Sequence, residues 1–195
     1  MSTGIASIVV DASSQNAIVI VAGGNGRLTP ALIERFDALL AGSGIVICQL
    51  EVPTETVFHT LTRARALGKT VILNPAPASE PLPANWYGLI DYLIPNESEA
   101  QTLTGVTVDS SAAAEEAAAA MLAAGARNVI ITLGERGTLF ASAAGVEHIP
   151  ARSVYRPWTP PLQVIPLSVV LPQHWRRVRV NRRPFASVRP RQPYP

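Results

Sequence analysis

The chain has 195 residues, of which 48% are hydrophobic and 15% charged, and its formal net charge is +2. This composition is typical of a globular domain and excludes a mainly disordered protein. No apolar run approaches the roughly 20 residues that a membrane span needs, and no basic segment before an apolar stretch marks the chain for export. A single cysteine, Cys48, excludes an internal disulfide and a multi-cysteine zinc site. We therefore expect a soluble, cytoplasmic protein without a membrane partner.

Charge is distributed unevenly along the chain. Residues 1–150 carry 7 Lys and Arg against 14 Asp and Glu, whereas residues 151–195 carry 9 Arg and no acid. The last 45 residues also contain 9 of the 17 prolines. This abrupt shift indicates two segments of different origin, and we place the boundary between residues 154 and 155.

The first 26 residues predict a β-hairpin. Two β-branched runs, 5–10 and 17–21, flank a polar turn. After a glycine-rich segment, Thr29 as N-cap and Pro30 at the first helical position predict a helix that runs to about residue 40. Its apolar residues form one stripe: Leu32, Ile33, Phe36, Leu39 and Leu40.

From there, short apolar runs alternate with amphipathic stretches. The pattern predicts strands at 45–50, 70–73, 92–94 and 129–133, helices at 53–67, 97–103 and 111–124, and a final hairpin of 139–142 and 146–149. The 45–50 run is expected to be buried on both faces. Repeated βα units of this kind indicate an α/β fold with a doubly wound, mostly parallel sheet and helices on both faces. Ligands of such sheets bind at the carboxyl ends of the strands.

Two carboxylates follow predicted strands. Glu51 comes directly after the 45–50 run, although the dipole of the next helix also favours an acid at this position. Asn96 and Glu99 are three residues apart at a helix start, which suits a hydrated magnesium ion and phosphates. The same pair is typical of an N-cap with a capping box, so both interpretations stay open.

The segment 132–137, TLGERG, is the third candidate. It leaves a strand through Gly134 and Gly137, which allow the backbone to approach a nucleotide closely. A hairpin turn also requires glycine, so the motif alone is not specific. Cys48 lies inside an apolar run and is interpreted as an inert core thiol.

In this order, the stretches QLEVP, LNPAPA, PNESEAQTLTG and ITLGERG resemble successive motifs of the ribokinase family, among the phosphofructokinase-B-like carbohydrate kinases. The segment GIASIVVDASSQNAIVIVAGGN resembles the β-hairpin lid of that family, and the resemblance runs from about residue 3 to about residue 154. It implies a ribokinase-like fold, ATP-dependent phosphorylation of D-ribose on its 5-hydroxyl, and a requirement for Mg²⁺. It also implies a homodimer formed through the lid and activation by a monovalent cation such as K⁺, for which no site is found in this sequence.

The resemblance assigns roles to individual residues. Glu51 matches the sugar-contacting glutamate of the family. The Asn-x-x-Glu motif for magnesium and phosphate matches Asn96 and Glu99. The loop beside the nucleotide matches three residues of the third candidate: Thr132, Gly134 and Gly137.

Two parts of the family pattern are not found. The chain begins at the lid, so we expect the N-terminal region that holds the sugar to be missing. After Val154 the family continues with Val-Asp-Thr-x-Ala/Gly-Ala-Gly-Asp, whose backbone amides form an anion hole and whose last Asp takes the hydroxyl proton. Residues 155–165 read YRPWTPPLQVI instead, so no catalytic residue is assigned.

A change of reading frame explains this difference. When the codons from Pro157 onward are read from their third base, Trp158 and Thr159 must give Asp, and the whole stretch permits VDTTAAGDSF. GC-rich codons read out of frame yield Arg and Pro, which accounts for the composition of the tail. We therefore interpret residues 1–154 as a partial carbohydrate kinase domain and residues 155–195 as a disordered or irregular tail that is not a domain.

Three functional hypotheses follow. The first is a ribokinase-family sugar kinase by descent, inactive in this chain because the catalytic Asp and the anion hole are missing. The second is a non-catalytic remnant that binds nucleotide. The third is nucleic-acid binding by the arginine-rich tail, with Trp175 and Phe185 stacking on bases. We interpret the tail as solvated and expect no specific nucleic-acid partner.

Overall fold

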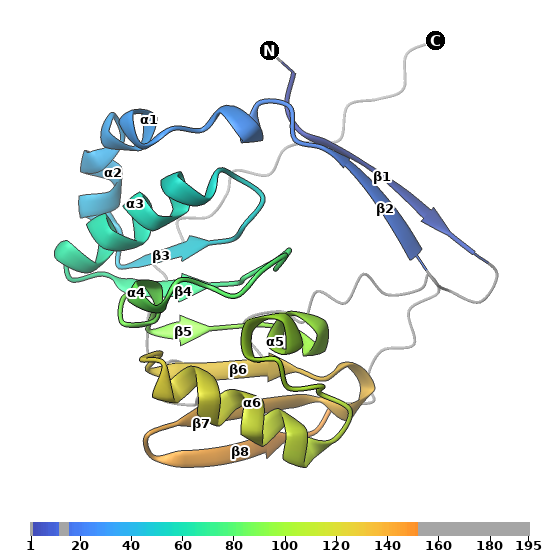
Figure 1. The fold of residues 1–195 in the computed structure, drawn as a ribbon. Coiled ribbons are helices and arrows are strands. Elements are labelled where there is room, and N and C mark those ends of the chain that lie inside the picture. The colour runs from blue at the N-terminus through green and yellow to red at the C-terminus, as the bar shows by residue number, and fades with distance from the viewer. Residues whose placement is uncertain (1, 12–15, 152–195) are drawn as a thin grey trace, which may run out of the picture. The chain divides into compact units, whose positions relative to one another are not determined.

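The structure, a computed structural model, describes residues 2–11 and 16–151. It begins with an antiparallel hairpin of β1 (Ile5–Val10) and β2 (Asn16–Val21), as the sequence predicts. Six further strands form one sheet in chain order (Figure 1): β3 (Ile45–Cys48), β4 (Thr70–Leu73), β5 (Tyr92–Leu93), β6 (Asn128–Thr132), β7 (Thr138–Ser142) and β8 (Gly145–Ile149). The predicted boundary at 154 and 155, and the tail after it, lie outside the described residues.

The sheet is mixed, with its parallel strands on one side. Strands β3 to β6 run parallel, and β7 and β8 continue the sheet as antiparallel neighbours of β6. Four helices lie between the parallel strands: α3 (Thr54–Ala66), α4 (Ala84–Tyr87), α5 (Glu97–Thr104) and α6 (Ser111–Ala123). The predicted α/β fold with a mostly parallel sheet is confirmed, and its elements differ from the prediction only slightly at their ends. The short helix α4 was not predicted.

One hydrophobic core lies between the sheet and helices α3 to α6. Alternate strand residues such as Val71, Leu73 and Ile131 are fully buried there against helix residues such as Leu61 and Met121. Each such side chain stabilises the fold by roughly 1.5–3 kcal/mol. In the described part of the chain, helices α3 to α6 all lie on this face of the sheet. The sequence led us to expect helices on both faces, and the described residues show them on this one.

The expectation that the first strand of the sheet is buried on both faces is wrong. Val46 of β3 is 8% exposed and belongs to the core, whereas Ile45 and Ile47 on the other face are 38% and 61% exposed. Strand β3 is an edge strand, with β4 as its hydrogen-bonded neighbour in the described sheet. A continuous apolar run cannot reveal which side of an edge strand stays uncovered.

The single helix predicted to run to about residue 40 is also wrong. The structure has two short helices, α1 (Pro30–Glu34) and α2 (Asp37–Gly42), and the backbone leaves the helical region at Phe36. Thr29 caps the first helix as predicted. The break places Asp37 in the first turn of the second helix, where both of its carboxylate oxygens accept hydrogen bonds from Arg63 of α3 at 2.6 and 2.8 Å. The ion pair joins the second helix to α3.

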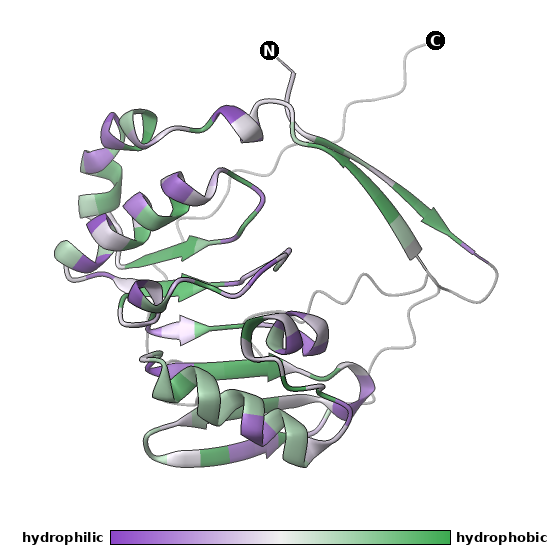
Figure 2. Cartoon of the chain, viewed as in Figure 1, coloured by the Kyte–Doolittle hydropathy of each residue, from purple (hydrophilic) through white to green (hydrophobic). Residues whose placement is uncertain are grey.

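The β1–β2 hairpin exposes apolar side chains along both strands, and Figure 2 shows both strands as hydrophobic. Eight of its residues are large, apolar and exposed: Ile5, Ile8, Val9, Val10, Ile18, Val19, Ile20 and Val21. A lone two-stranded hairpin is marginally stable in water. Exposed apolar surface of this kind marks an interaction site.

Candidate functional site

The start of helix α5 carries the first pair of candidate residues. Asn96 is the N-cap, and its side-chain oxygen accepts a hydrogen bond from the Glu99 backbone N–H at 2.8 Å. The Asn96 backbone N–H in turn donates to Glu99 Oε2 at 2.8 Å. The capping box that the sequence left open as an alternative is therefore present. It fixes both side chains at the positive end of the helix, where the helix dipole favours an anionic ligand.

The end of strand β6 lies directly beside this helix start. The Thr132 backbone N–H donates to the Pro95 carbonyl at 3.0 Å, and Asn96 and Thr132 form a parallel β-bridge. Two motifs that are distant in the sequence thus meet at the carboxyl ends of neighbouring strands. This is the edge at which sheets of this class bind ligands.

The two glycines of the β6–β7 connection have different roles. Both have positive φ angles: 55° at Gly134, which begins a 3₁₀ turn (Gly134–Arg136), and 91° at Gly137, which follows it. A Cβ atom at Gly137 would collide with the Ile149 carbonyl and lie 2.7 Å from the Ala151 nitrogen. Packing against the end of β8 therefore explains Gly137. Gly134 instead lines a cavity.

That cavity has a volume of about 410 Å³, and three predicted site residues line it: Asn96, Thr132 and Gly134. Five further residues complete the described lining: Glu97, Ser98, Gln101, Thr107 and Val108. The sequence analysis missed these five. The helical spacing of four between Glu97 and Gln101 could have indicated these two residues. The loop between α5 and α6, which supplies the other two, carries no such signal.

Glu99 is buried, with 9% of its surface exposed, and is not among the residues that line the cavity. Burial raises the pKa of its carboxyl above the ordinary value, and the hydrogen bond from the Asn96 backbone N–H opposes that shift. The described residues contain no group of three or more His, Cys, Asp or Glu side chains placed to hold a metal ion. Asn96 lines the cavity at the helix N-terminus and the Glu99 carboxylate does not, so a Mg²⁺ ion there would keep most of its waters and be held mainly by phosphates.

Glu51 and Cys48 lie at the end of β3, apart from this cavity. Glu51 is exposed, and its backbone N–H donates to the Gln49 side chain. Strand β4 separates β3 from β5, so the structure does not bring Glu51 together with the other predicted site residues. Cys48 packs against the core, and burial raises the pKa of its thiol to about 11, which agrees with its interpretation as a core thiol.

Among the helices that the structure describes, none is both long and apolar enough to cross a membrane.

Comparison with known proteins places this geometry in a family. The profile of the pfkB family carbohydrate kinases matches residues 1–155. A deoxyribokinase of Salmonella typhi is 38% identical over 150 residues, which cover 77% of this chain and 49% of that protein. A ribokinase of Staphylococcus aureus is 40% identical over 153 residues, which cover 78% of this chain and 50% of that protein.

Solved structures agree with these relatives. A ribokinase of Arabidopsis thaliana complexed with ribose and ATP superposes with a TM-score of 0.68 at 26% identity, over 75% of this chain and 48% of that one. A ribokinase of Thermotoga maritima gives a TM-score of 0.67 at 35% identity, over 78% and 49%. The chain spans about half the length of the relatives that it matches. The chain therefore belongs to the pfkB family of carbohydrate kinases.

Proposed function

We propose that this chain carries the nucleotide-binding part of an ATP-dependent pentose kinase, which transfers the γ-phosphoryl group of ATP to the 5-hydroxyl of D-ribose. The observation that carries the proposal is the cavity at the ends of β5 and β6, where Asn96, Thr132 and Gly134 line the same space. The relatives named ribokinase, and the Arabidopsis thaliana ribokinase structure with ribose and ATP, support this choice. Because ATP is the phosphoryl donor, we place the protein in the cytoplasm.

The chemistry of the cavity suits phosphate groups. Its lining is mostly neutral and polar, and the N-terminus of α5 directs its dipole and free backbone N–H groups toward it. Gly134 lets the backbone approach a ligand without a side chain in between. Asn96, which lines the cavity, would hold a hydrated Mg²⁺ through water, and the ion would neutralise phosphate charge. The family resemblance assigns Glu99 to the same ion, although its buried carboxylate lies outside the lining. K⁺ activation is carried over from the family, with no residue assigned to it.

The sugar would contact Glu51. This proposal is supported by the position of Glu51, an exposed carboxylate that follows a parallel strand at the carboxyl edge of the sheet. Relatives named ribokinase and deoxyribokinase match this chain at 40% and 38% identity, so both pentoses are substrates to test. We expect D-ribose to be preferred, because the four motifs that identify the family are those of ribokinase.

We further propose that this chain does not turn over sugar by itself. Residues 157–165 read PWTPPLQVI, and the motif that would supply the base and the anion hole is permitted by their codons in the other reading frame. A general base contributes ~10²–10⁴ in rate and one oxyanion-hole donor ~10²–10³. Resequencing the DNA tests the change of frame, and an intact frame that encodes PWTPPLQVIP would contradict it. Nucleotide binding without turnover is then the function that remains.

The β1–β2 hairpin supports a homodimer. Its eight exposed apolar residues face water along both strands in a single chain, and a second copy would cover them. Sedimentation equilibrium tests this: the native chain should associate, and Val9→Asp should make it monomeric. Leu39→Asp, which changes a 73% exposed residue outside the hairpin, is the matched control. Association that survives Val9→Asp would contradict the hairpin as the interface.

Two assays test the proposed function. Calorimetric titration with ATP and Mg²⁺ should show weak binding that Gly134→Ala abolishes. Gly68→Ala is the matched control, because Gly68 also has a positive φ of 67° but has open space around it and lies outside the cavity. A coupled ADP-release assay with ribose and 2-deoxyribose should show no turnover. Equal loss of ATP binding in both glycine variants would contradict the cavity as the nucleotide site.

A further inference from the structure

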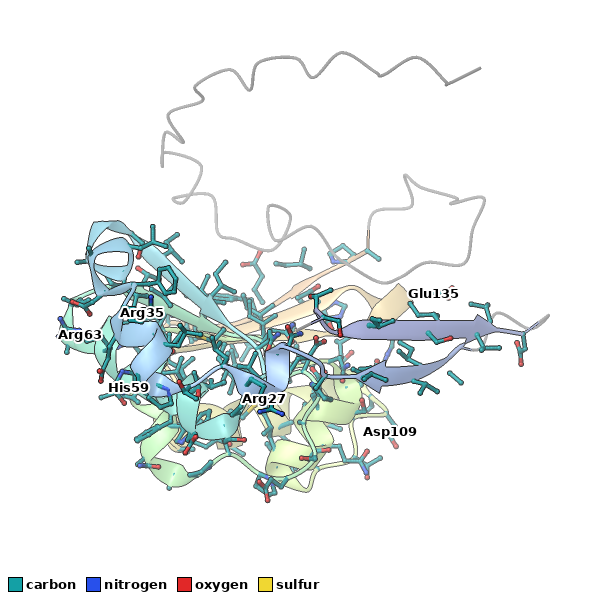
Figure 3. The ribbon with its side chains drawn as sticks, turned by 90° about the horizontal axis from the view of Figure 1, so that it is seen from above. Arg27, Arg35, His59, Arg63, Asp109 and Glu135 are labelled. Carbon is teal, nitrogen blue, oxygen red and sulfur yellow. The ribbon has the colours of Figure 1, made fainter. Side chains whose placement is uncertain are left out.

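The side chain of Arg136 connects three separate segments of the chain. Its Nη2 donates to Glu97 Oε1 at 2.6 Å and to the Val108 carbonyl at 3.3 Å, while Nη1 donates to the Asp109 carbonyl at 2.9 Å. Arg136 itself belongs to the β6–β7 connection, Glu97 to the first turn of α5, and the two carbonyls to the loop between α5 and α6. Figure 3 labels Asp109 and Glu135, the neighbour of Arg136, on the same side of the view.

These same three segments build the cavity. Its eight described lining residues all come from the end of β6 with the following turn, from α5 with its N-cap, and from the α5–α6 loop. Arg136 is not itself a lining residue. Its guanidinium therefore holds the walls from outside.

We propose that Arg136 is a positioning residue for the nucleotide: it fixes the three walls relative to one another and cancels the charge of Glu97. The inference rests on the proposed nucleotide binding. Arginine suits this task because its planar fork offers several N–H donors in fixed directions and stays charged at every physiological pH. A lysine would keep the charge but lose the simultaneous bonds to a carboxylate and two carbonyls.

The electrostatic part follows from the composition of the cavity. Among its described lining residues, Glu97 alone carries a charge, and that charge has the sign of a phosphate. Without Arg136, a polyphosphate in the cavity would meet an uncompensated carboxylate. Both side chains are partly exposed, 36% for Arg136 and 42% for Glu97, so solvent screens the repulsion. We expect a loss of ~10-fold in affinity from charge, rather than a complete loss.

The positioning part follows from the turn. The turn is closed on itself, because the Leu133 N–H donates to the Gly137 carbonyl at 2.8 Å and the Gly137 N–H to the Gly134 carbonyl at 3.1 Å. These bonds do not reach the wall formed by the α5–α6 loop. The Arg136 guanidinium supplies bonds across that gap, so its removal should free the turn to move while the sheet stays intact.

Four variants separate the two parts: Arg136→Met, Arg136→Lys, Glu97→Gln and the double variant Glu97→Gln/Arg136→Met. The ligands are ATP with Mg²⁺ and uncharged adenosine, titrated by calorimetry. Arg136→Met should weaken ATP binding at least tenfold, and adenosine binding less. The double variant should regain the ATP affinity that was lost through the uncompensated charge of Glu97, and its adenosine affinity should stay that of Arg136→Met. Arg136→Lys should likewise regain only the charge-dependent ATP affinity.

The matched control is Arg127→Met, which removes another arginine that pairs with a carboxylate, Asp91, at 3.0 Å but lies outside the cavity. It should leave nucleotide affinity unchanged. ATP affinity of Arg136→Met equal to that of the native chain would overturn the inference. A native chain that binds no nucleotide would instead overturn the proposed function. Amide hydrogen exchange at Leu133 and Gly137 tests whether Arg136 fixes the turn. Faster exchange in Arg136→Met than in Arg127→Met supports this role, and equal exchange overturns it.

Discussion

Replacing Asn96 with alanine distinguishes a helix cap from a ligand-binding residue. The change removes the acceptor of the Glu99 backbone N–H at 2.8 Å and of the Ser98 hydroxyl at 2.9 Å. The reciprocal bond from the backbone N–H of residue 96 to Glu99 survives, because it does not use the Asn96 side chain. Loss of an N-cap costs ~1 kcal/mol, and the second, exposed bond adds little, so we expect a loss of about 1–2 kcal/mol in the free energy of unfolding.

Ser110→Ala is the matched control. Ser110 is the N-cap of α6 and accepts a hydrogen bond from the Ala113 N–H at 3.2 Å, outside the cavity. Both variants should lower the midpoint of urea unfolding by ~0.3–2 M, given slopes of ~1–3 kcal/mol/M. Only Asn96→Ala should also weaken ATP binding, by ~10-fold or more, because a hydrogen bond to a charged group is worth ~1.5–3 kcal/mol. Equal ATP affinity in the two variants would show that Asn96 is a cap and nothing more.

Three further predictions concern stability. Burial raises the pKa of the Glu99 carboxyl. The native chain should therefore lose stability relative to Glu99→Gln as pH rises from 4.5 through the raised pKa. Urea unfolding at a series of pH values measures this, and free energies of unfolding that change with pH in the same way in both chains would contradict it. Gly137→Ala should cost more than Gly145→Ala, by about 1–3 kcal/mol, since both have positive φ but only Gly137 faces backbone atoms; equal thermal midpoints would refute the packing argument. Asp91→Asn should cost about 2 kcal/mol in urea unfolding, because the buried carboxylate accepts bonds from the Val71 N–H and two arginines. A cost near zero would mean that these bonds are replaceable.

Local signals in the sequence were sufficient for most of the fold. Apolar runs predicted the strands. Thr29 and Asn96 predicted the starts of two helices, and Ser110 caps a third helix that the sequence also predicted. The break at Phe36 could not be predicted, because the apolar stripe continues through it without a glycine or proline. The exposed face of β3 likewise depends on its position at the sheet edge, which is a property of strand order.

The candidate site divides in the same way. The strand-end rule pointed to Asn96 and Thr132, and the structure places these two residues side by side in a β-bridge. It could not predict the α5–α6 loop as a cavity wall, because that loop has no local pattern. The pairing of Arg136 with Glu97 spans 39 residues and involves two ordinary charged residues, so neither stood out before the fold brought them together.

Titration of the chain with ATP and Mg²⁺ tests the central claim most directly. The account predicts saturable binding with one site for each chain, a dissociation constant well above the low micromolar range, and loss of binding in Gly134→Ala but not in Gly68→Ala. Absence of binding at millimolar ATP would contradict the cavity as a nucleotide site. Binding in the low micromolar range would contradict the claim that this chain lacks the amides that hold the phosphates.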